Sequence, residues 1–276
     1  MKVVYLGTGA AEGIPALFCN CDFCKRMRAE GCVRSRSQIL IDELSVDFPP
    51  DGFYHAARSG VDFSAIKYIL VSHSHMDHFY AHDFILRGYK YAAEMRSPTL
   101  DLFLNEESAE VFYESTRREL RKDVAKTITL HPVKSFQKIE FGGFTVYPLK
   151  AQHSSRDPLL FLIEKDGKRI LHLHDTGAIP EETYAYLSSL ERKPCNLITL
   201  DCTFLWDETK AGSRHMGLDE NARVLRRLNE LGFVGEDTKK VITHFSHNSR
   251  PTEESLKRAE CEYGVIAAYD GMTLEI

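Results

Sequence analysis

The chain has 276 residues, of which 43% are hydrophobic and 27% are charged, and its formal net charge is −5. This composition is ordinary for a globular protein with a sizeable core. The negative charge argues against a protein held mainly by nucleic-acid phosphates, and no apolar run approaches the ~20 residues that a membrane-spanning helix needs. No linker, repeat or low-complexity segment divides the sequence, so we expect one domain over residues 1–276.

The cysteines and the first residues bear on the compartment. The number of cysteines, seven, is odd, and three of them (Cys19, Cys21 and Cys24) lie within six residues. This spacing argues against a disulfide framework and favours a reducing compartment and a metal site. The opening apolar segment is broken by Gly7, too early for a signal peptide, and is typical of a strand. We therefore expect a cytoplasmic protein with no membrane partner.

Short segments rich in β-branched and aromatic residues alternate with amphipathic ones along the chain. The predicted strands are 3–6, 38–42, 68–72, 100–104, 127–131, 144–149, 159–164, 169–174, 196–201, 240–243, 265–268 and 272–276. The predicted helices are 22–30, 81–93, 108–121, 181–190, 219–231 and 253–263. Asp166-Gly167 indicates a tight hairpin. This order predicts two mixed sheets sandwiched between helices rather than one parallel sheet.

The densest group of reactive side chains is His73-Ser74-His75-Met76-Asp77-His78, between strand 68–72 and helix 81–93. Imidazole nitrogens and carboxylate oxygens are ligands that divalent metals such as zinc accept. His73 and His75 are two residues apart and point the same way on an extended backbone, whereas Asp77 and His78 lie past the bend. One turn of this shape can serve two metals. The alternative is a polar loop with solvated histidines.

Three more candidate ligands, His153, Asp175 and His244, each follow a predicted strand. A strand that ends at a sheet edge delivers the next side chain to that edge. Taken alone, a histidine in such a place is more often an ordinary core or surface residue. The value of these three residues therefore depends on their joining the first motif.

Together with Gly7-Thr8-Gly9, these motifs resemble the metallo-β-lactamase superfamily over essentially the whole chain. The resemblance implies an α/β fold, the four-layer αβ/βα sandwich, with the site at one edge between the sheets. It implies that one metal is held by His73, His75 and His153, the other by Asp77, His78 and His244, and that Asp175 bridges both. Nitrogen and oxygen ligands admit zinc, manganese or iron at the two positions.

A second group of ligands sets this chain apart within the superfamily. Cys19, Cys21 and Cys24 are one ligand short of a closed tetrahedral zinc site, and His247 can supply the fourth. The alternative is incidental loop or buried thiols. The combination resembles the PhnP-like phosphodiesterase branch, of the phosphoribosyl cyclic phosphate phosphodiesterase type. The resemblance implies a structural zinc that pins the N-terminal loop to the His244 loop.

The same branch has a catalytic histidine that binds no metal in a loop where this sequence has His215. The resemblance implies that His215 protonates the leaving oxygen and that Asp77 orients the nucleophile. The expected reaction is hydrolysis of a small (cyclic) phosphodiester by in-line attack of a metal-bound hydroxide. The resemblance also suggests a homodimer.

Other functions of the superfamily remain open from the sequence. A transfer-RNA 3′-processing endonuclease shares the dinuclear motif, but the net charge and the lack of a basic arm argue against nucleic acid as a partner. A lactonase or thioesterase lacks the cysteine cluster. A non-enzymatic quinone-cofactor biosynthesis protein keeps that cluster but has a degraded dinuclear motif.

A few further side chains are open to more than one interpretation. Arg156 is a candidate contact for a substrate anion, although surface arginines are common. His172 and His174 are expected in the core or beside the ligands. His82 is expected to pack or cap on helix 81–93, and His55 to lie at the surface or in a loop.

Overall fold

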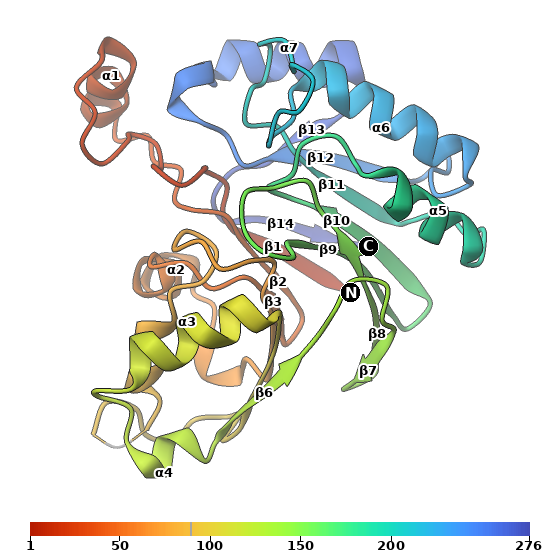
Figure 1. The fold of residues 1–276 in the computed structure, drawn as a ribbon. Coiled ribbons are helices and arrows are strands. Elements are labelled where there is room, and N and C mark those ends of the chain that lie inside the picture. Colours follow the sequence, from red (N-terminus) through yellow and green to blue (C-terminus); the bar gives the residue numbers. More distant parts are fainter. Residues whose placement is uncertain (89) are drawn as a thin grey trace.

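The computed structural model of the protein describes residues 1–88 and 90–276. Two seven-stranded sheets pack face to face and carry helices on their outer sides (Figure 1). The strand order is β14-β1-β2-β3-β4-β5-β6 in the first sheet and β13-β12-β11-β10-β9-β8-β7 in the second. The predicted α/β sandwich is confirmed, whereas the single domain stays a prediction.

The strands of the first sheet are β1 (Lys2–Gly7), β2 (Gln38–Ile41), β3 (Leu44–Val46), β4 (Tyr68–Leu70), β5 (Leu100–Leu104), β6 (Ile128–Pro132) and β14 (Met272–Glu275). Those of the second are β7 (Ile139–Phe141), β8 (Phe144–Lys150), β9 (Leu159–Lys165), β10 (Lys168–Leu173), β11 (Leu197–Asp201), β12 (Lys239–Thr243) and β13 (Ile266–Ala267). The helices are α1 (Asp22–Glu30), α2 (Gly52–Ser59), α3 (Glu106–Thr116), α4 (Lys122–Ala125), α5 (Glu181–Ser189), α6 (Leu218–Glu230) and α7 (Glu253–Tyr263), with 3-10 turns η1 (Phe63–Ala65), η2 (Ala81–Leu86) and η3 (His247–Ser249).

Alternation along the strands builds the four layers. On β1, Val3 and Tyr5 belong to the core between the sheets, whereas Val4 and Leu6 face the helices that cover the first sheet. Successive side chains of a strand point to opposite faces, so a strand that is apolar throughout is buried on both. Helices α2, α3 and α4 cover the first sheet, and α5, α6 and α7 cover the second (Figure 1).

Two helices, α1 and α7, have the bounds predicted from the sequence, because their caps are local. Thr252 accepts a hydrogen bond from the backbone N–H of Ser255 at the start of α7, and Gly264 ends it with a φ of 60°. A side-chain acceptor at the N-cap and a left-handed glycine at the C-cap are readable in the sequence. The hairpin at Asp166-Gly167 also forms, and it joins β9 to β10.

Two helix predictions were wrong in extent. The segment predicted as helix 81–93 is the 3-10 turn η2 alone, since Gly88 has a φ of 135°, which no helix accommodates; Tyr89 lies outside the described residues. Helix 108–121 begins earlier, at Glu106, because Asn105 caps it, and it ends at Thr116. The short strands β3 and β7 were not predicted.

The parallel strands bring one set of strand ends together. β3, β4, β5 and β6 run parallel in the first sheet, and β10, β11, β12 and β13 run parallel in the second. The carboxyl ends of parallel strands share an edge, where loops carry functional groups. In the part of the chain that the structure describes, no helix is long and apolar enough to cross a membrane.

Candidate metal centre

The turn after β4 presents its side chains toward the second sheet. The backbone N–H groups of His78 and Phe79 both donate to the carbonyl of His75, at 3.0 and 2.8 Å, which closes a single tight turn. His73 precedes this turn, and Asp77 and His78 lie within it. The bend therefore separates the ligands in the way the sequence predicted.

One cluster combines His73, His75, His153 and Asp175, whose ligand atoms all lie within 4.8 Å of one another. The Nε2 atoms of His73 and His153 lie 3.0 and 3.1 Å from His75 Nδ1. The same two nitrogens are 3.1 and 3.2 Å from Asp175 Oδ2. His153 follows β8 and Asp175 follows β10, so the second sheet supplies half of this cluster.

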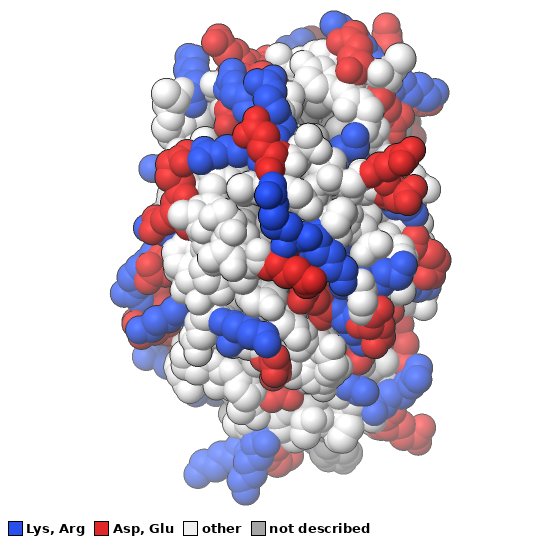
Figure 2. Space-filling view, turned by 90° about the vertical axis from the view of Figure 1, so that its right-hand side faces the viewer, with Lys and Arg blue, Asp and Glu red and all other residues white. Residues whose placement is uncertain are grey.

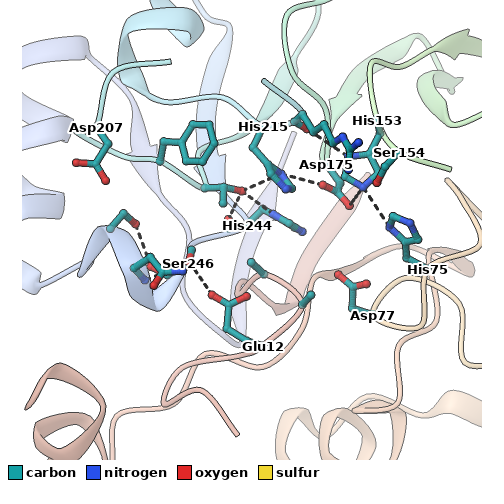
Figure 3. Close-up of a pocket in the computed structure, with 17 residues that line it drawn as sticks. Glu12, His75, Asp77, His153, Ser154, Asp175, Asp207, His215, His244 and Ser246 are labelled. Carbon is teal, nitrogen blue, oxygen red and sulfur yellow. Dashed lines mark hydrogen bonds and ion pairs between the residues drawn. The ribbon is translucent and has the colours of Figure 1, made fainter. Parts of the chain in front are cut away.

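A second cluster combines Asp77, His78, His244 and again Asp175. His78 Nε2 lies 3.1 Å from Asp175 Oδ2, 3.3 Å from Asp77 Oδ2 and 3.3 Å from His244 Nε2. All four residues are buried. Asp175 thus lies between the two clusters, and Figure 3 shows its carboxylate among His153, His215 and His244.

Three of the histidines, His78, His153 and His244, are oriented through Nδ1, so that Nε2 faces the cluster, whereas His75 faces its cluster with Nδ1. His78 Nδ1 donates to Asp47 Oδ2 at 2.6 Å, and His153 Nδ1 donates to the Arg214 carbonyl at 3.2 Å. His244 Nδ1 lies 2.9 Å from Thr203 Oγ1. Histidines that bind metals typically have their second nitrogen fixed in this way.

This donor set fits divalent cations. Burial lowers the pKa of His73 and brings the pKa of His153 to about 4, so both rings are neutral and direct lone pairs at His75 and Asp175. Burial also opposes a charge on His78, but Asp77 and Asp47 outweigh it and raise the pKa of His78 well above its ordinary value. Nitrogen lone pairs and carboxylates that face one another repel, and a bound cation would remove this repulsion. The cation would displace any protons that the ligands carry.

Two buried aspartates behind the ligands were not predicted as site residues. Asp47 follows β3 and accepts hydrogen bonds from His78 and from Ser72, whose N–H is 2.8 Å from Asp47 Oδ1. Asp201 ends β11, and its Oδ2 lies 3.1 Å from His215 Nδ1 and 3.5 Å from His244 Nδ1. An acidic residue at the end of a strand of this edge is the sequence pattern that points to Asp201.

His215 lies at the wall of the centre with its side chain 26% exposed. Its Nδ1 is 2.9 Å from Asp175 Oδ1 and 3.1 Å from Asp201 Oδ2. Burial opposes a charge on this ring, but the two carboxylates outweigh it, Asp201 foremost, and raise the pKa of His215 to about 10. The structure therefore places His215 beside the candidate ligands, and its catalytic role stays a prediction.

A cavity of about 400 Å³ opens over both clusters (Figure 3). Its lining includes His75, Asp77, His153, Asp175, His215 and His244 together with Glu12, Phe204, Asp207, Arg214, Ser246 and Asn248. Among the described lining residues, Arg214 is the one Lys or Arg.

The cysteine cluster forms beside this cavity. Cys19, Cys21, Cys24 and His247 have ligand atoms within 4.8 Å of one another. The backbone N–H of Cys24 points at Cys21 Sγ and lowers the pKa of Cys21 to about 6, whereas burial raises that of Cys24 to about 11. Glu12 joins the cluster to the cavity wall, because it accepts hydrogen bonds from Ser246 Oγ and from the N–H of His247, at 2.6 and 3.2 Å.

The remaining candidates lie outside the cavity. The Arg156 guanidinium pairs with Glu110 at 2.8 Å, and His82 lies beside the Ser115 carbonyl at 2.9 Å. His172 and His174 are buried with ring centroids 3.9 Å apart. His55 was predicted at the surface or in a loop, and this was wrong: it lies in helix α2 and is 1% exposed, between Gln38 Oε1 and Ser35 Oγ, because α2 lays it against β1 and β2.

Comparisons with known proteins give the same fold. The family model "Beta-lactamase superfamily domain" matches residues 46–245. Curated relatives include an octanoyltransferase of Porphyromonas gingivalis, 24% identical over 99% of this chain, and Coenzyme PQQ synthesis protein B of Methylorubrum extorquens, 23% identical over the whole of both chains. The chain spans about half the length (51%) of the octanoyltransferase.

Solved structures agree over nearly the whole chain. A diphosphatase from the PhnP family has a TM-score of 0.71 at 21% identity, covering 99% of this chain and 97% of its own. The zinc-bound PqqB of Methylobacterium extorquens has a TM-score of 0.72 at 19% identity, covering both chains fully. At such low identity these likenesses establish the fold, and the chemistry has to be argued from the residues of this chain.

Proposed function

The chain belongs to the β-lactamase superfamily, and from this membership we propose that it is a metal-dependent hydrolase of small phosphodiesters, in the PhnP-like branch. One observation carries the proposal: two ligand clusters share Asp175 at the floor of a cavity whose wall holds His215. Two divalent metals can activate water and neutralise phosphate charge, and an imidazole outside the metal ligands can protonate the leaving oxygen; together these groups suit phosphodiester hydrolysis.

The residues would hold two divalent metals, zinc, manganese or iron, with Asp175 shared between them. His73, His75 and His153 complete the first site, and Asp77, His78 and His244 complete the second. When bound, such a pair neutralises phosphate charge and lowers the pKa of a water molecule. Cys19, Cys21, Cys24 and His247 would hold a structural zinc, and Glu12 would transmit its position to the cavity wall.

The protein's own side chains supply orientation and a proton. Asp77 lines the cavity and would accept a hydrogen bond from the attacking water, aligning its lone pair with phosphorus. His215 stands on another part of the wall, where Asp201 fixes its Nδ1. From there the ring would donate a proton to the leaving oxygen, which weakens the bond that breaks.

The cavity supports a small substrate over nucleic acid. Arg214 is the one Lys or Arg among the described lining residues, and Glu12 and Asp207, which are outside the metal clusters, would repel a polyanion. On the face drawn in Figure 2, Lys and Arg are interspersed with Asp and Glu rather than gathered in one basic field. Transfer RNA is therefore a poorer candidate than a cyclic or short linear phosphodiester.

The test is hydrolysis of bis(para-nitrophenyl) phosphate by purified protein supplied with Mn²⁺ or Zn²⁺. We expect His215→Ala to lower kcat by about 10²–10⁴-fold on a phosphodiester with an alkoxide leaving group, as loss of a general acid does, and by much less on bis(para-nitrophenyl) phosphate, whose phenolate leaves without a proton, with the metal content unchanged. His131→Ala is the matched control, because His131 pairs with Asp101 outside the cavity. Wild-type protein that cleaves a lactone, a thioester, a diphosphate or transfer RNA, but no small phosphodiester, would contradict the proposal.

The homodimer suggested by the resemblance stays a prediction. Light scattering of the purified protein tests it directly. A particle mass near 31.5 kDa, that of one chain, would contradict it.

A further inference from the structure

The start of helix α3 lies between the two loops that carry the histidines of the first metal cluster. α3 follows β5 at the same sheet edge as the His73 turn, which follows the neighbouring strand β4. The loop of His153 approaches from the other sheet: the N–H of Leu159 donates to the Ser72 carbonyl at 2.8 Å. The two loops are therefore neighbours that belong to different sheets, so no strand pairing within one sheet fixes their spacing.

Asn105 fixes one side of this junction. Its Oδ1 accepts the N–H of Ser108 at 2.8 Å and caps α3, while its Nδ2 donates to the carbonyls of Arg156 and Asp157, at 3.0 and 2.8 Å. Asp157 has a φ of 50°, in the left-handed region that non-glycine residues rarely adopt. The His153 loop is therefore held in its shape by contacts with α3.

Glu107 joins the two loops through one atom. Its Oε2 accepts a hydrogen bond from Ser74 Oγ at 2.8 Å and another from the N–H of Arg156 at 2.9 Å. Ser74 lies between His73 and His75, and Arg156 is three residues after His153. A single carboxylate oxygen thus joins the two loops that carry the three histidines of the first cluster.

We propose that Glu107 is a positioning residue that sets the spacing of His73 and His75 against His153, and so the metal affinity of that site alone. The inference rests on the proposed dinuclear centre and deepens it. Glu107 touches no metal ligand side chain, and its effect passes through the backbone of two loops. Among the described residues, the hydrogen bonds of Glu107 go to Ser74 and Arg156 and not to the second site, whose Asp77 and His78 lie further along the turn and whose His244 follows β12.

Each site can be measured by itself in a suitable background. His244→Ala disables the second site and leaves the first, His153→Ala does the reverse, and the double variant reports binding elsewhere, which is subtracted. Co²⁺ is titrated calorimetrically into each background with and without Glu107→Leu, which removes the acceptor at similar volume. Circular dichroism of each variant checks that it is folded.

We expect Glu107→Leu to weaken Co²⁺ binding at the first site by about tenfold, the lower end for partners outside the ligand set, and to change the second site by less than about twofold. Glu107→Gln keeps an oxygen acceptor and should restore most of the affinity. Glu106→Leu is the matched control on the same helical turn, because Glu106 is exposed and pairs only loosely with Lys134, at 3.9 Å.

The outcomes separate the two proposals. Unchanged binding at the first site, or an equal loss at both sites, would overturn the role of Glu107 while leaving the centre intact. If the backgrounds themselves bind no more Co²⁺ than the double variant, the dinuclear centre is refuted and the inference falls with it.

Discussion

Replacing Asp47 by asparagine tests how the histidines are oriented, because it removes a charge at nearly constant shape. Asp47 is buried; its Oδ2 accepts the Nδ1–H of His78 at 2.6 Å, and its Oδ1 accepts the N–H of Ser72 at 2.8 Å. An amide placed either way sets an N–H against one of these donors. Both hydrogen bonds are kept only if the asparagine NH2 group donates to His78 Nδ1, which requires the His78 tautomer with its proton on Nε2. Nε2 is the nitrogen that faces the second metal position.

The expected loss follows from that geometry. Changing the hydrogen-bond partner of a histidine that binds metal typically costs about 10–100-fold in metal affinity, or about 1.4–2.7 kcal/mol. We expect Asp47→Asn to weaken the Asp77/His78/His244 site by this factor and to raise the Mn²⁺ concentration needed for half-maximal phosphodiester hydrolysis in proportion. The first site, which Asp47 reaches only through the Ser72 hydroxyl, 3.0 Å from Asp47 Oδ2 and 3.0 Å from His73 Nδ1, should lose less affinity than the second.

The chain offers a matched control in Asp101→Asn. Asp101 Oδ1 pairs with His131 Nε2 at 2.7 Å, in a partly exposed position outside the cavity. This variant removes the same kind of contact and should leave metal affinity unchanged. Wild-type metal affinity in Asp47→Asn, with the fold intact, would refute the assignment of His78 Nε2 as the metal-facing atom.

Three further predictions concern the cysteine cluster, the stability at acid pH and the core. Cys21→Ser should remove one equivalent of zinc by elemental analysis and lower Tm, while an equal zinc content would exclude the cysteine cluster. Burial lowers the pKa of His55 to about 4 in the folded protein, below its value in the unfolded chain. The unfolded chain therefore binds more protons between about pH 6.5 and 4, and the free energy of unfolding falls as the pH is lowered through this window, by roughly 3 kcal/mol for this residue. Urea titrations of His55→Gln should show a shallower pH dependence of stability in this window, and an unchanged slope would refute the assignment. Phe161→Ala empties a fully buried position between the sheets, and should lower the free energy of unfolding by about 3–5 kcal/mol; a loss below 1 kcal/mol would mean that the core is looser than described.

The fold was predictable where a local pattern decides the structure. Helices α1 and α7 have the predicted bounds, and the hairpin at Asp166-Gly167 forms, since caps and tight turns are specified by neighbouring residues. The segment after Ala81 was mispredicted because its apolar periodicity continues past Gly88, whose backbone conformation ends the helix.

The sequence predicted some residues of the site and missed others. The residues expected to bind metal converge as the motif order indicated, because they follow strands that end at one edge. Asp47 escaped prediction because it follows β3, a strand of three residues, and has a left-handed φ of 66°. His55 escaped it because burial on α2 depends on packing against a distant strand, which local sequence does not encode.

Three groups of the described residues that could hold a metal draw their ligands from both halves of the sandwich, whereas a fourth, Asp175 with Asp201, His215 and His244, lies wholly in the second half. His73 to His78 follow a strand of the first sheet, while His153, Asp175 and His244 follow strands of the second, and the cysteines after β1 face His247 after β12. Bound cations would therefore act as cross-links that fasten one sheet to the other, and their binding energy adds to the energy that holds the sheets together. Removing the metals with a chelator should therefore loosen the contact between the sheets first at the edge that carries the clusters. Amide hydrogen exchange should then become faster at the ends of β4 and β10 than at their centres.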